Sequence, residues 1–457
     1  MNDKKITVNK IVEICNGKLI SGDVNIEIEE YSKDTRTLNK GDMYLGIKGE
    51  KINGNDYIEK AFINGAIGCI TDGEINVEIL NKYKNKIIIK VEDTIKAIQE
   101  LAKYKRSLYN IPVIAVTGSV GKTSTKDIIA NVLAQKFKVL KTEGNMNNHI
   151  GLPMTLLKLK DHTAIVVEMG MNHFGEISLL TDIAKPTGCV ITNIGTSHIG
   201  NLGSRENILK AKLEILEGLD KNGFVLINND NDLLHEWAKK EKRYKIYTYG
   251  LEKNSIYMAK NITTLENSSE FEINGIKGNV PIGGIHFVYN SVCAFAVGDI
   301  LNVGKEKIIK GISEFKLTAK RMDIEIIKNN IKVINDSYNA SYDSMKAALE
   351  VVNNTLAQRK IAILGDMLEL GEYAKELHEK VGEEVVKNKI DILITIGDNA
   401  KNIANKAKEL KMENVYMFDG IEEAIEYIKK TIKCGDLILL KASNSMNFSK
   451  ILNEIKA

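Results

Sequence analysis

The segment Thr117–Thr123 carries the residue types that bind a triphosphate. It follows the apolar run Val113–Val116, bears two glycines, and ends in Lys122 and Thr123 at the start of a helix-like stretch. Glycines let backbone N–H groups close around phosphates, the helix N-terminus and the lysine supply positive charge, and the threonine hydroxyl can reach Mg²⁺. Val116 stands where the usual P-loop pattern has a glycine, so the loop is a shortened variant. We therefore predict a nucleotide-phosphate site made by Gly118, Ser119, Val120, Gly121, Lys122, Thr123 and Ser124.

Two further polar residues follow predicted strands of the same region. Glu168 comes directly after the apolar run Ala164–Val167, and His198 lies a few residues past the run Gly188–Ile194. Ligands of open parallel sheets bind outside the carboxyl ends of the strands, which is also where the phosphate loop must lie. A carboxylate and an imidazole at that edge favour a Mg-nucleotide site over two unrelated structural roles.

Lys212 lies in a predicted helix, Ser204–Asp220, on the apolar face, where a lysine is unusual. At 100° per residue it sits in the middle of the apolar stripe, whereas Lys210 lies on the far side. Lysine is almost never fully buried without a partner. Two interpretations remain open here: the side chain reaches water along its stem, or a lowered pKa suits its amine to a modification or a site.

A second polar cluster opens the last third of the chain. Asp336 and Asn339 follow the apolar run Ile331–Ile334 and precede a predicted helix that begins at Ser341. Asp and Asn are common turn and capping residues. Their position at the carboxyl end of a strand also suits contact with a ligand.

The elements that position these residues alternate along the chain. A length of 457 residues suggests roughly three domains. Near-continuous apolar strands separated by helical stretches indicate parallel, doubly wound sheets. We predict an α/β protein with a small mixed N-terminal domain (1–109), a central doubly wound P-loop ATPase-like domain (110–317) and a Rossmann-like C-terminal domain (318–457).

The composition excludes several classes of protein. A formal charge of +3 gives no electrostatic argument for a nucleic-acid or membrane-surface partner. Five scattered cysteines without a C-x-x-C spacing are typical of reduced thiols and not of a disulfide or zinc framework. The sequence has neither a signal-peptide pattern nor an apolar run long enough to span a membrane. We expect a cytoplasmic monomer.

Together these segments resemble the ATP-dependent Mur ligases of bacterial cell-wall synthesis along nearly the whole chain. The loop around Lys122, the turn Gly144–Pro153, and the segments with Glu168, His198 and Lys212 follow one another in family order. Segments Asp336–Met345 and Leu364–His378 are most similar to the members that add D-alanyl-D-alanine to a UDP-N-acetylmuramoyl-tripeptide. The resemblance implies that these two small molecules are the partners, and that the N-terminal domain binds the uridine nucleotide.

The resemblance also implies roles for individual residues. In the family, the lysine that matches Lys212 is carbamylated by CO₂, and its carbamate helps to hold the second of two Mg²⁺ ions. Thr123, Glu168 and His198 would surround the metals, and Lys122 would neutralise the β- and γ-phosphates of ATP. The remaining nucleotide contacts would come from Asn290, Arg321, Asp336 and Asn339. The substrate contacts would come from Asp34, Thr35, Arg36, Lys48, Asn145, Asn147 and Asn148.

The implied reaction forms an acyl phosphate and then an amide. Two positions depart from the family pattern: Asn444 stands in place of an arginine, and Phe287 in place of a frequent asparagine. One alternative is another ligase of the superfamily, such as a folylpolyglutamate synthase, which lacks the N-terminal domain. The other is a P-loop NTPase switch, which would hydrolyse nucleotide without an amino-acid acceptor.

Overall fold

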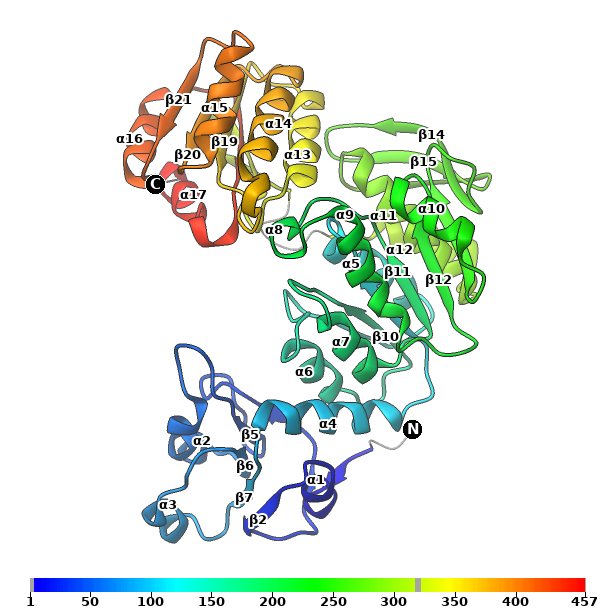
Figure 1. The fold of residues 1–457 in the computed structure, drawn as a ribbon, viewed down its shortest axis with the longest axis vertical. Helices are drawn as coiled ribbons and strands as arrows, with labels where there is room; N and C mark the ends of the chain where they lie inside the picture. The colour runs from blue at the N-terminus through cyan, green and yellow to red at the C-terminus, as the bar shows by residue number, and fades with distance from the viewer. Residues whose placement is uncertain (1–3, 317–321, 457) are drawn as a thin grey trace.

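The computed structural model describes residues 4–316 and 322–456. Arg321 and the predicted boundary at 317/318 lie outside the described residues. The chain forms three lobes in a curved row, each built around its own sheet, with the phosphate-loop lobe in the middle (Figure 1). Within the described ranges, no helix has the length and hydropathy needed to cross a membrane.

The N-terminal lobe contains a five-stranded sheet of order β2-β7-β6-β5-β4 and a small two-stranded sheet, β1-β3. Its strands are β1 (Ile6–Thr7), β2 (Lys18–Ser21), β3 (Glu27–Ile28), β4 (Tyr31–Ser32), β5 (Met43–Gly46), β6 (Gly68–Thr71) and β7 (Ile87–Lys90). Its helices are α1 (Val8–Ile14), the 3-10 turn η1 (Gly54–Tyr57), α2 (Ile58–Ile63) and α3 (Val77–Lys82).

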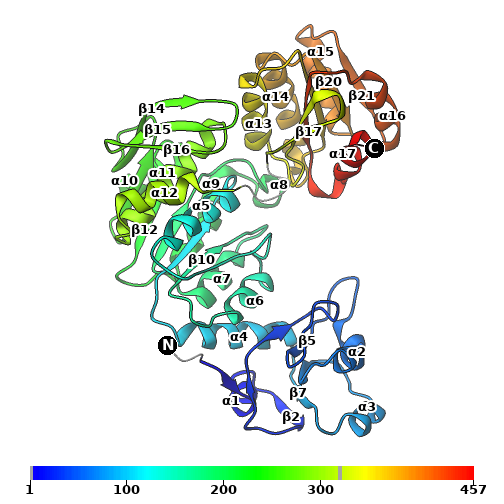
Figure 2. The ribbon, with the colours of Figure 1, turned by 180° about the vertical axis from the view of Figure 1, so that it is seen from behind.

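Helix α4 (Thr94–Ser107) joins this lobe to the central one. Asp93 caps its N-terminus through the amides of Ile95 and Lys96. At its other end, Arg106 Nε donates to the Ala184 carbonyl at 2.9 Å, and the Lys103 ammonium lies 2.5 Å from Asp182. The helix therefore rests on the central lobe, as Figure 2 shows from behind.

The central lobe holds a nine-stranded sheet of order β16-β15-β14-β13-β12-β11-β8-β10-β9. The run from β9 to β14 is parallel, and β15 and β16 are antiparallel additions. The strands are β8 (Val113–Thr117), β9 (Val139–Lys141), β10 (Ala164–Glu168), β11 (Gly188–Ile191), β12 (Phe224–Asn228), β13 (Lys245–Gly250), β14 (Tyr257–Thr264), β15 (Ser269–Ile273) and β16 (Ile276–Val280). Strands β8, β10 and β11 are buried throughout, because helices cover both faces of the sheet.

The central helices are α5 (Lys122–Ala134), α6 (Gly151–Leu157), α7 (Glu176–Ala184), α8 (Ile199–Leu202), α9 (Arg205–Leu213), the 3-10 turn η2 (Glu214–Leu216), α10 (Asp232–Lys240), α11 (Ile285–Ile300) and α12 (Lys305–Ser313). The helix predicted to run from Ser204 to Asp220 thus ends at Leu213 and tightens into a 3-10 turn. The Ile215 carbonyl instead accepts from Thr181 Oγ1 at 2.8 Å, which diverts it from the helical ladder.

The C-terminal lobe is a six-stranded sheet of order β17-β18-β22-β19-β20-β21, parallel except for β17. Its strands are β17 (Asp323–Ile327), β18 (Ile331–Asn335), β19 (Arg359–Gly365), β20 (Ile392–Ile396), β21 (Val415–Phe418) and β22 (Asp436–Lys441). Its helices are α13 (Tyr342–Asn354), α14 (Ala374–Lys387), α15 (Ala400–Glu409), α16 (Ile421–Thr431) and α17 (Ser449–Lys456), with 3-10 turns η3 (Lys328–Asn330), η4 (Gly371–Tyr373) and η5 (Asn444–Met446). The α/β fold with a doubly wound centre and a Rossmann-like C-terminal sheet, predicted from the sequence, is confirmed.

Candidate active site

The phosphate loop connects β8 to α5 and depends on its first glycine. Gly118 has φ 150°, and a Cβ atom there would lie 1.9 Å from Thr192 Oγ1. No side chain fits into that space. Lys122 folds back over the loop, where its ammonium donates to the Gly118 carbonyl at 2.9 Å. The loop is therefore compact and carries its positive charge on the side where α5 begins.

A second loop, residues 192–197, supports the phosphate loop from the carboxyl end of β11. The Asn193 carbonyl accepts from the Ser119 amide at 3.0 Å, and its Oδ1 accepts from the Val120 amide at 2.9 Å. The Ser197 hydroxyl donates to the Ser119 carbonyl at 3.3 Å. The sequence analysis placed residues 188–194 in a strand. The strand ends at Ile191, and beyond it Asn193 and Ser197 bond to the phosphate loop.

Glu168 brings two predicted site residues together. Its Oε2 accepts from Thr123 Oγ1 at 2.8 Å, and its Oε1 accepts from Asn147 Nδ2 at 2.7 Å. The three residues come from α5, β10 and the turn before α6. Glu168 is 1% exposed and Thr123 is 2% exposed, so a carboxylate and a hydroxyl share a nearly dry position at the end of the sheet.

Lys212 points inward, as its position on the helix predicts, and is 1% exposed, whereas Lys210 is exposed. Among the described residues, no carboxylate forms an ion pair with its ammonium. Burial lowers the pKa of Lys212 well below its usual value, and the positive charge of Lys122 nearby lowers it further. The neutral amine is therefore favoured at this position.

The C-terminal lobe contributes a buried ion pair to the same region. Lys441, at the end of β22, is 1% exposed, and its ammonium pairs with the Asp336 carboxylate and donates to the Asn339 carbonyl at 3.1 Å. His286, at the start of α11 in the central lobe, lies near this pair. Burial lowers the pKa of His286 to about 4.

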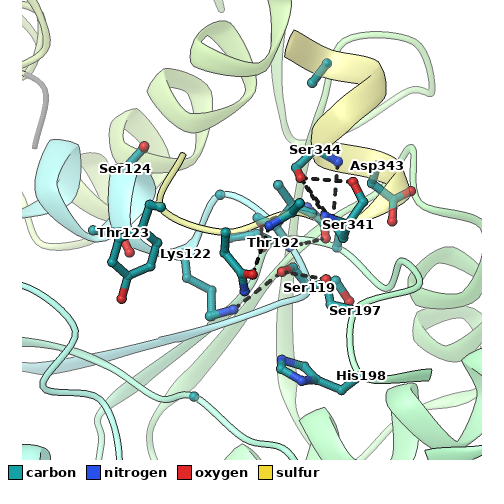
Figure 3. Close-up of a pocket in the computed structure, with 18 of the residues that line it drawn as sticks. Ser119, Lys122, Thr123, Ser124, Thr192, Ser197, His198, Ser341, Asp343 and Ser344 are labelled. Atoms are coloured by element: carbon teal, nitrogen blue, oxygen red, sulfur yellow. Dashed lines mark hydrogen bonds between the residues drawn. The ribbon is translucent and has the colours of Figure 1, made fainter. Parts of the chain in front are cut away.

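Most of these groups line one cavity of about 1060 Å³ between the central and C-terminal lobes. Figure 3 shows the phosphate-loop residues Lys122 and Thr123 facing Asp343 and Ser344 of α13, and Ser341, which caps that helix, across it. Its lining includes these predicted residues: Ser119, Val120, Gly121, Lys122, Thr123, Ser124, Asn145, Asn147, Asn148, Glu168, His198, Asn290, Asp336 and Asn339. Its volume is at the upper end of the range typical of small-molecule sites.

Comparison with known proteins identifies this architecture. Three family models match: the Mur ligase family catalytic domain at residues 27–106, the Mur ligase middle domain at 116–298, and the Mur ligase glutamate ligase domain at 320–444. The UDP-N-acetylmuramoyl-tripeptide–D-alanyl-D-alanine ligase of Bacillus subtilis is 37% identical, over 99% of this chain and 98% of that protein. The protein of the same name from Synechocystis is 35% identical over 98% and 97%. The chain belongs to the Mur ligase family.

Solved structures place this Mur ligase in the same fold. Crystal structure I of MurF from Acinetobacter baumannii covers all of both chains with a TM-score of 0.89 at 28% identity. The crystal structure of MurF ligase from Thermotoga maritima in complex with ADP has a TM-score of 0.80 at 26% identity, over 94% of this chain and 97% of that one.

The predicted metal ligands of this Mur ligase suit Mg²⁺ in their chemistry. Within the described part of the chain, no three His, Cys, Asp or Glu side chains gather around one point. Mg²⁺, however, commonly uses one or two carboxylates together with water and substrate phosphates. The adjacent oxygens of Thr123 and Glu168 suit that pattern, and they lie beside the phosphate loop. The residues present therefore fit a Mg-nucleotide site.

Four predicted substrate residues lie apart from the cavity, in the N-terminal lobe: Asp34, Thr35, Arg36 and Lys48. Arg36 and Asp34 form a fork of hydrogen bonds, and the Arg36 guanidinium lowers the pKa of Asp34 to about 2. The Arg36 side chain is 82% exposed. Gly118 and Lys212 also fall outside the cavity lining, although both lie against residues that form it.

Several lining residues of this Mur ligase were missed by the sequence analysis: Thr192, Asn193, Asn228, Asp230, Asn231, His286, Tyr289, Asp343, Glu369, Lys441 and Ser443. The sequence pattern could have identified one group of these residues. Residues 228–231 read Asn-Asn-Asp-Asn directly after the apolar run Phe224–Ile227, which predicts a strand, so the strand-end rule that singled out Glu168 applies to them as well. Asp230 accepts from the Leu251 amide at 2.6 Å and the Tyr289 hydroxyl at 2.9 Å, which fixes this wall of the cavity.

Proposed function

We propose that this Mur ligase uses ATP to join D-alanyl-D-alanine to UDP-N-acetylmuramoyl-tripeptide in peptidoglycan precursor synthesis. One observation carries the proposal: two relatives named for this activity are 37% and 35% identical and align over nearly the whole chain. The cavity supports it, because a phosphate loop, a dry carboxylate and a second lobe meet there. Such a site can bind a nucleotide and two further small molecules.

Most of the proposed nucleotide contacts belong to the cavity lining. Gly118, Ser119, Val120, Gly121 and Ser124 would form the loop around the phosphates at the start of α5. Lys122 would place its charge against the β- and γ-phosphates. Asn290 would lie near the adenine; its Oδ1 accepts from Thr125 Oγ1 at 2.9 Å, which fixes the amide. Arg321, Asp336 and Asn339 would approach from the C-terminal side.

Thr123, Glu168, His198 and a carbamate on Lys212 would hold two Mg²⁺ ions. The ions would neutralise phosphate oxygens so that a carboxylate can approach them. The chemistry of Lys212 supports the carbamate: only a neutral amine adds to the carbon of CO₂, with loss of one N–H proton. Its product carries a negative charge beside Lys122, where the unmodified ammonium would add a second positive one.

The proposed reaction has two steps, formation of an acyl phosphate and then of an amide. The terminal carboxylate of the tripeptide attacks the γ-phosphorus of ATP, the bond to the β-phosphate oxygen breaks, and ADP leaves. The free amine of D-alanyl-D-alanine then attacks the acyl carbon, phosphate leaves, and the nitrogen loses a proton. Lys122 stabilises the phosphate charge in both steps. Closure between the two lobes excludes water, which would otherwise hydrolyse the acyl phosphate.

The other two contact sets complete the assignment. Asp34, Thr35, Arg36 and Lys48 would bind the uridine nucleotide in an N-terminal domain of residues 1–109. Asn145, Asn147 and Asn148 would contact the substrate beside the central ATP-binding domain, residues 110–317. Residues 318–457 would form the closing domain. We assign the enzyme to the cytoplasm as a monomer.

A single assay tests the activity. The protein is incubated with ATP, Mg²⁺, UDP-N-acetylmuramoyl-tripeptide and D-alanyl-D-alanine, and phosphate and product mass are measured. We expect phosphate release only when both co-substrates are present, with one dipeptide added for each phosphate. Release that ignores both co-substrates would indicate an NTPase switch instead. Extension of a folate by glutamate, without any muramoyl product, would indicate a folylpolyglutamate synthase.

A further inference from the structure

The segment Gly195–Gly203 contacts two parts of the molecule at once. On one side, the Gly195 amide donates to Ser119 Oγ at 2.9 Å, which ties the segment to the phosphate loop. On the other, the Thr196 amide donates to the Asp343 carboxylate at 3.0 Å, and Tyr373 Oη donates to the Gly203 carbonyl at 2.6 Å. The segment is therefore the physical connection between the phosphate loop and the C-terminal lobe.

His198, in the middle of this segment, is bonded to the C-terminal lobe. Its Nδ1 lies 2.5 Å from Glu369 Oε2, across 171 residues of sequence. An ionised carboxylate only accepts, so Nδ1 carries the proton and Nε2 keeps its lone pair. His198 lines the cavity, and Nε2 is the ring nitrogen that remains for a ligand there. A histidine fixed in this way is the usual arrangement behind a metal-binding imidazole.

The backbone conformation around His198 and Glu369 indicates that their contact is a specific feature of the fold. His198 has φ 64° and Glu369 has φ 62°, so both partners occupy the left-handed region that non-glycine residues avoid. The Gly200 amide donates to the Glu369 carbonyl at 3.0 Å. A Cβ atom at Gly200 would lie 2.5 Å from the Gly371 nitrogen, so the approach requires a glycine.

Stability alone does not explain the pair. The Glu369 side chain is 46% exposed, and exposed ion pairs contribute little to folding. Backbone strain at both residues opposes even that small gain. The pair instead fixes the orientation of the His198 imidazole by a contact from the C-terminal lobe.

We propose that Glu369 is a positioning residue for His198. Docking of the C-terminal lobe on Gly195–Gly203 sets the imidazole so that Nε2 faces the metal-nucleotide site. By linkage, a bound metal-nucleotide then strengthens docking by the same factor. The inference rests on the proposed function, since it takes His198 to be a ligand in an ATP site.

The test measures binding and not turnover. Binding of Mn²⁺ to the full-length protein with ADP is followed by electron paramagnetic resonance. Glu369→Ala should raise the Mn²⁺ dissociation constant by about tenfold, as loss of a partner behind a metal ligand usually does. Glu369→Gln should stay close to wild type, because its Oε1 still accepts from Nδ1. Glu372→Ala is the matched control, since Glu372 is an exposed glutamate three residues further along the chain, in η4. Equal Mn²⁺ affinity of Glu369→Ala and wild type would overturn the proposal.

Gly200→Ala keeps the inference testable if Glu369→Ala fails to fold. Alanine is the better helix former, so on α8 alone the change is favourable. Its methyl group would push Gly371 away, and we expect weaker Mn²⁺ binding and faster amide exchange in residues 195–203. Unchanged Mn²⁺ affinity in this variant would also overturn the proposal. If wild type makes the peptide product while these variants bind Mn²⁺ normally, only the role of Glu369 fails. If wild type makes no product, the proposed function itself fails.

Discussion

Two lysines of this Mur ligase are withdrawn from solvent to the same extent, Lys212 in α9 of the central lobe and Lys441 in β22 of the C-terminal lobe. Each is 1% exposed. Lys441 pairs with Asp336, whereas the charged neighbour of Lys212 is another lysine, Lys122. Burial therefore does not decide what a lysine does. Lys441 has a carboxylate partner for its ammonium, whereas burial without such a partner lowers the pKa of Lys212 and favours the neutral amine.

The strongest test of this contrast is Lys212→Ala. We expect kcat/KM for ligation to fall by on the order of 1000-fold, the upper range for loss of a group that stabilises transition-state charge. Lys210→Ala, two residues away on the exposed face, should keep near wild-type activity. Wild-type activity should also fall in CO₂-free buffer and return with bicarbonate. A harmless Lys212→Ala beside a damaging Lys210→Ala would reverse the assignment.

Removing the partner of the other lysine should affect stability instead. Asp336→Ala leaves the Lys441 ammonium buried without its counter-charge, and breaking a buried pair costs about 3 kcal/mol. The unfolding of the C-terminal lobe in urea measures this loss. Glu454→Ala, which breaks the exposed pair with Lys429 in the same lobe, should cost no more than about 1 kcal/mol. Equal losses in the two variants would contradict the distinction between the buried and the exposed ion pair.

The pH dependence of stability should distinguish the lysines further. The folded-state pKa of Lys212 lies below its unfolded value of 10.5, so the unfolded chain binds more protons. Stability in CO₂-free buffer should therefore rise with pH up to about 10.5, by at most ~1.4 kcal/mol per pH unit for one proton. Lys212→Met should remove this slope and raise the melting temperature at pH 8. A slope between pH 8 and 10 that survives the substitution would show that Lys212 is charged in the folded state.

The effect confined to the narrowest range of conditions is expected at His286, beside the Lys441–Asp336 pair. Its folded pKa of about 4 lies below the unfolded value of 6.5, so its contribution to stability is lost as pH falls from 6.5 towards 4. NMR titration of the ring should give a midpoint near 4. His286→Phe should flatten the stability curve only in that window and leave the slope at higher pH unchanged. A ring that titrates near 6.5 would mean that it is hydrated.

Local patterns in the sequence were enough to locate much of this site. Strand-end logic led to Thr123 and Glu168, which the structure joins by one hydrogen bond, and helix periodicity gave the inward direction of Lys212. The same reasoning predicted two elements that are too long. The strand that begins at Gly188 ends at Ile191, and the helix predicted to reach Asp220 ends at Leu213. In both places the backbone leaves its regular pattern to bond to a distant segment, the phosphate loop in one case and Thr181 in the other.

The missed contacts share a physical cause. Glu369 meets His198 across 171 positions, and Asp343 meets Thr196 across 147. Contacts of this kind depend on how two lobes dock, which no period of 2.0 or 3.6 residues records. Asn228 and Asp230 are different, because they followed a predicted strand and the strand-end rule applied to them.

The closeness of Gly118 to Thr192 has a consequence for inhibition of this enzyme. A ligand that binds mainly to the main-chain N–H groups of residues 118–124 touches a surface that mutation cannot readily reshape, because any side chain at 118 would displace the loop. Escape from such a compound should arise instead at the rim, where Asn444 and Ser445 line the cavity. Substitutions that confer resistance should therefore be rare in the phosphate loop and more frequent at the rim of the cavity.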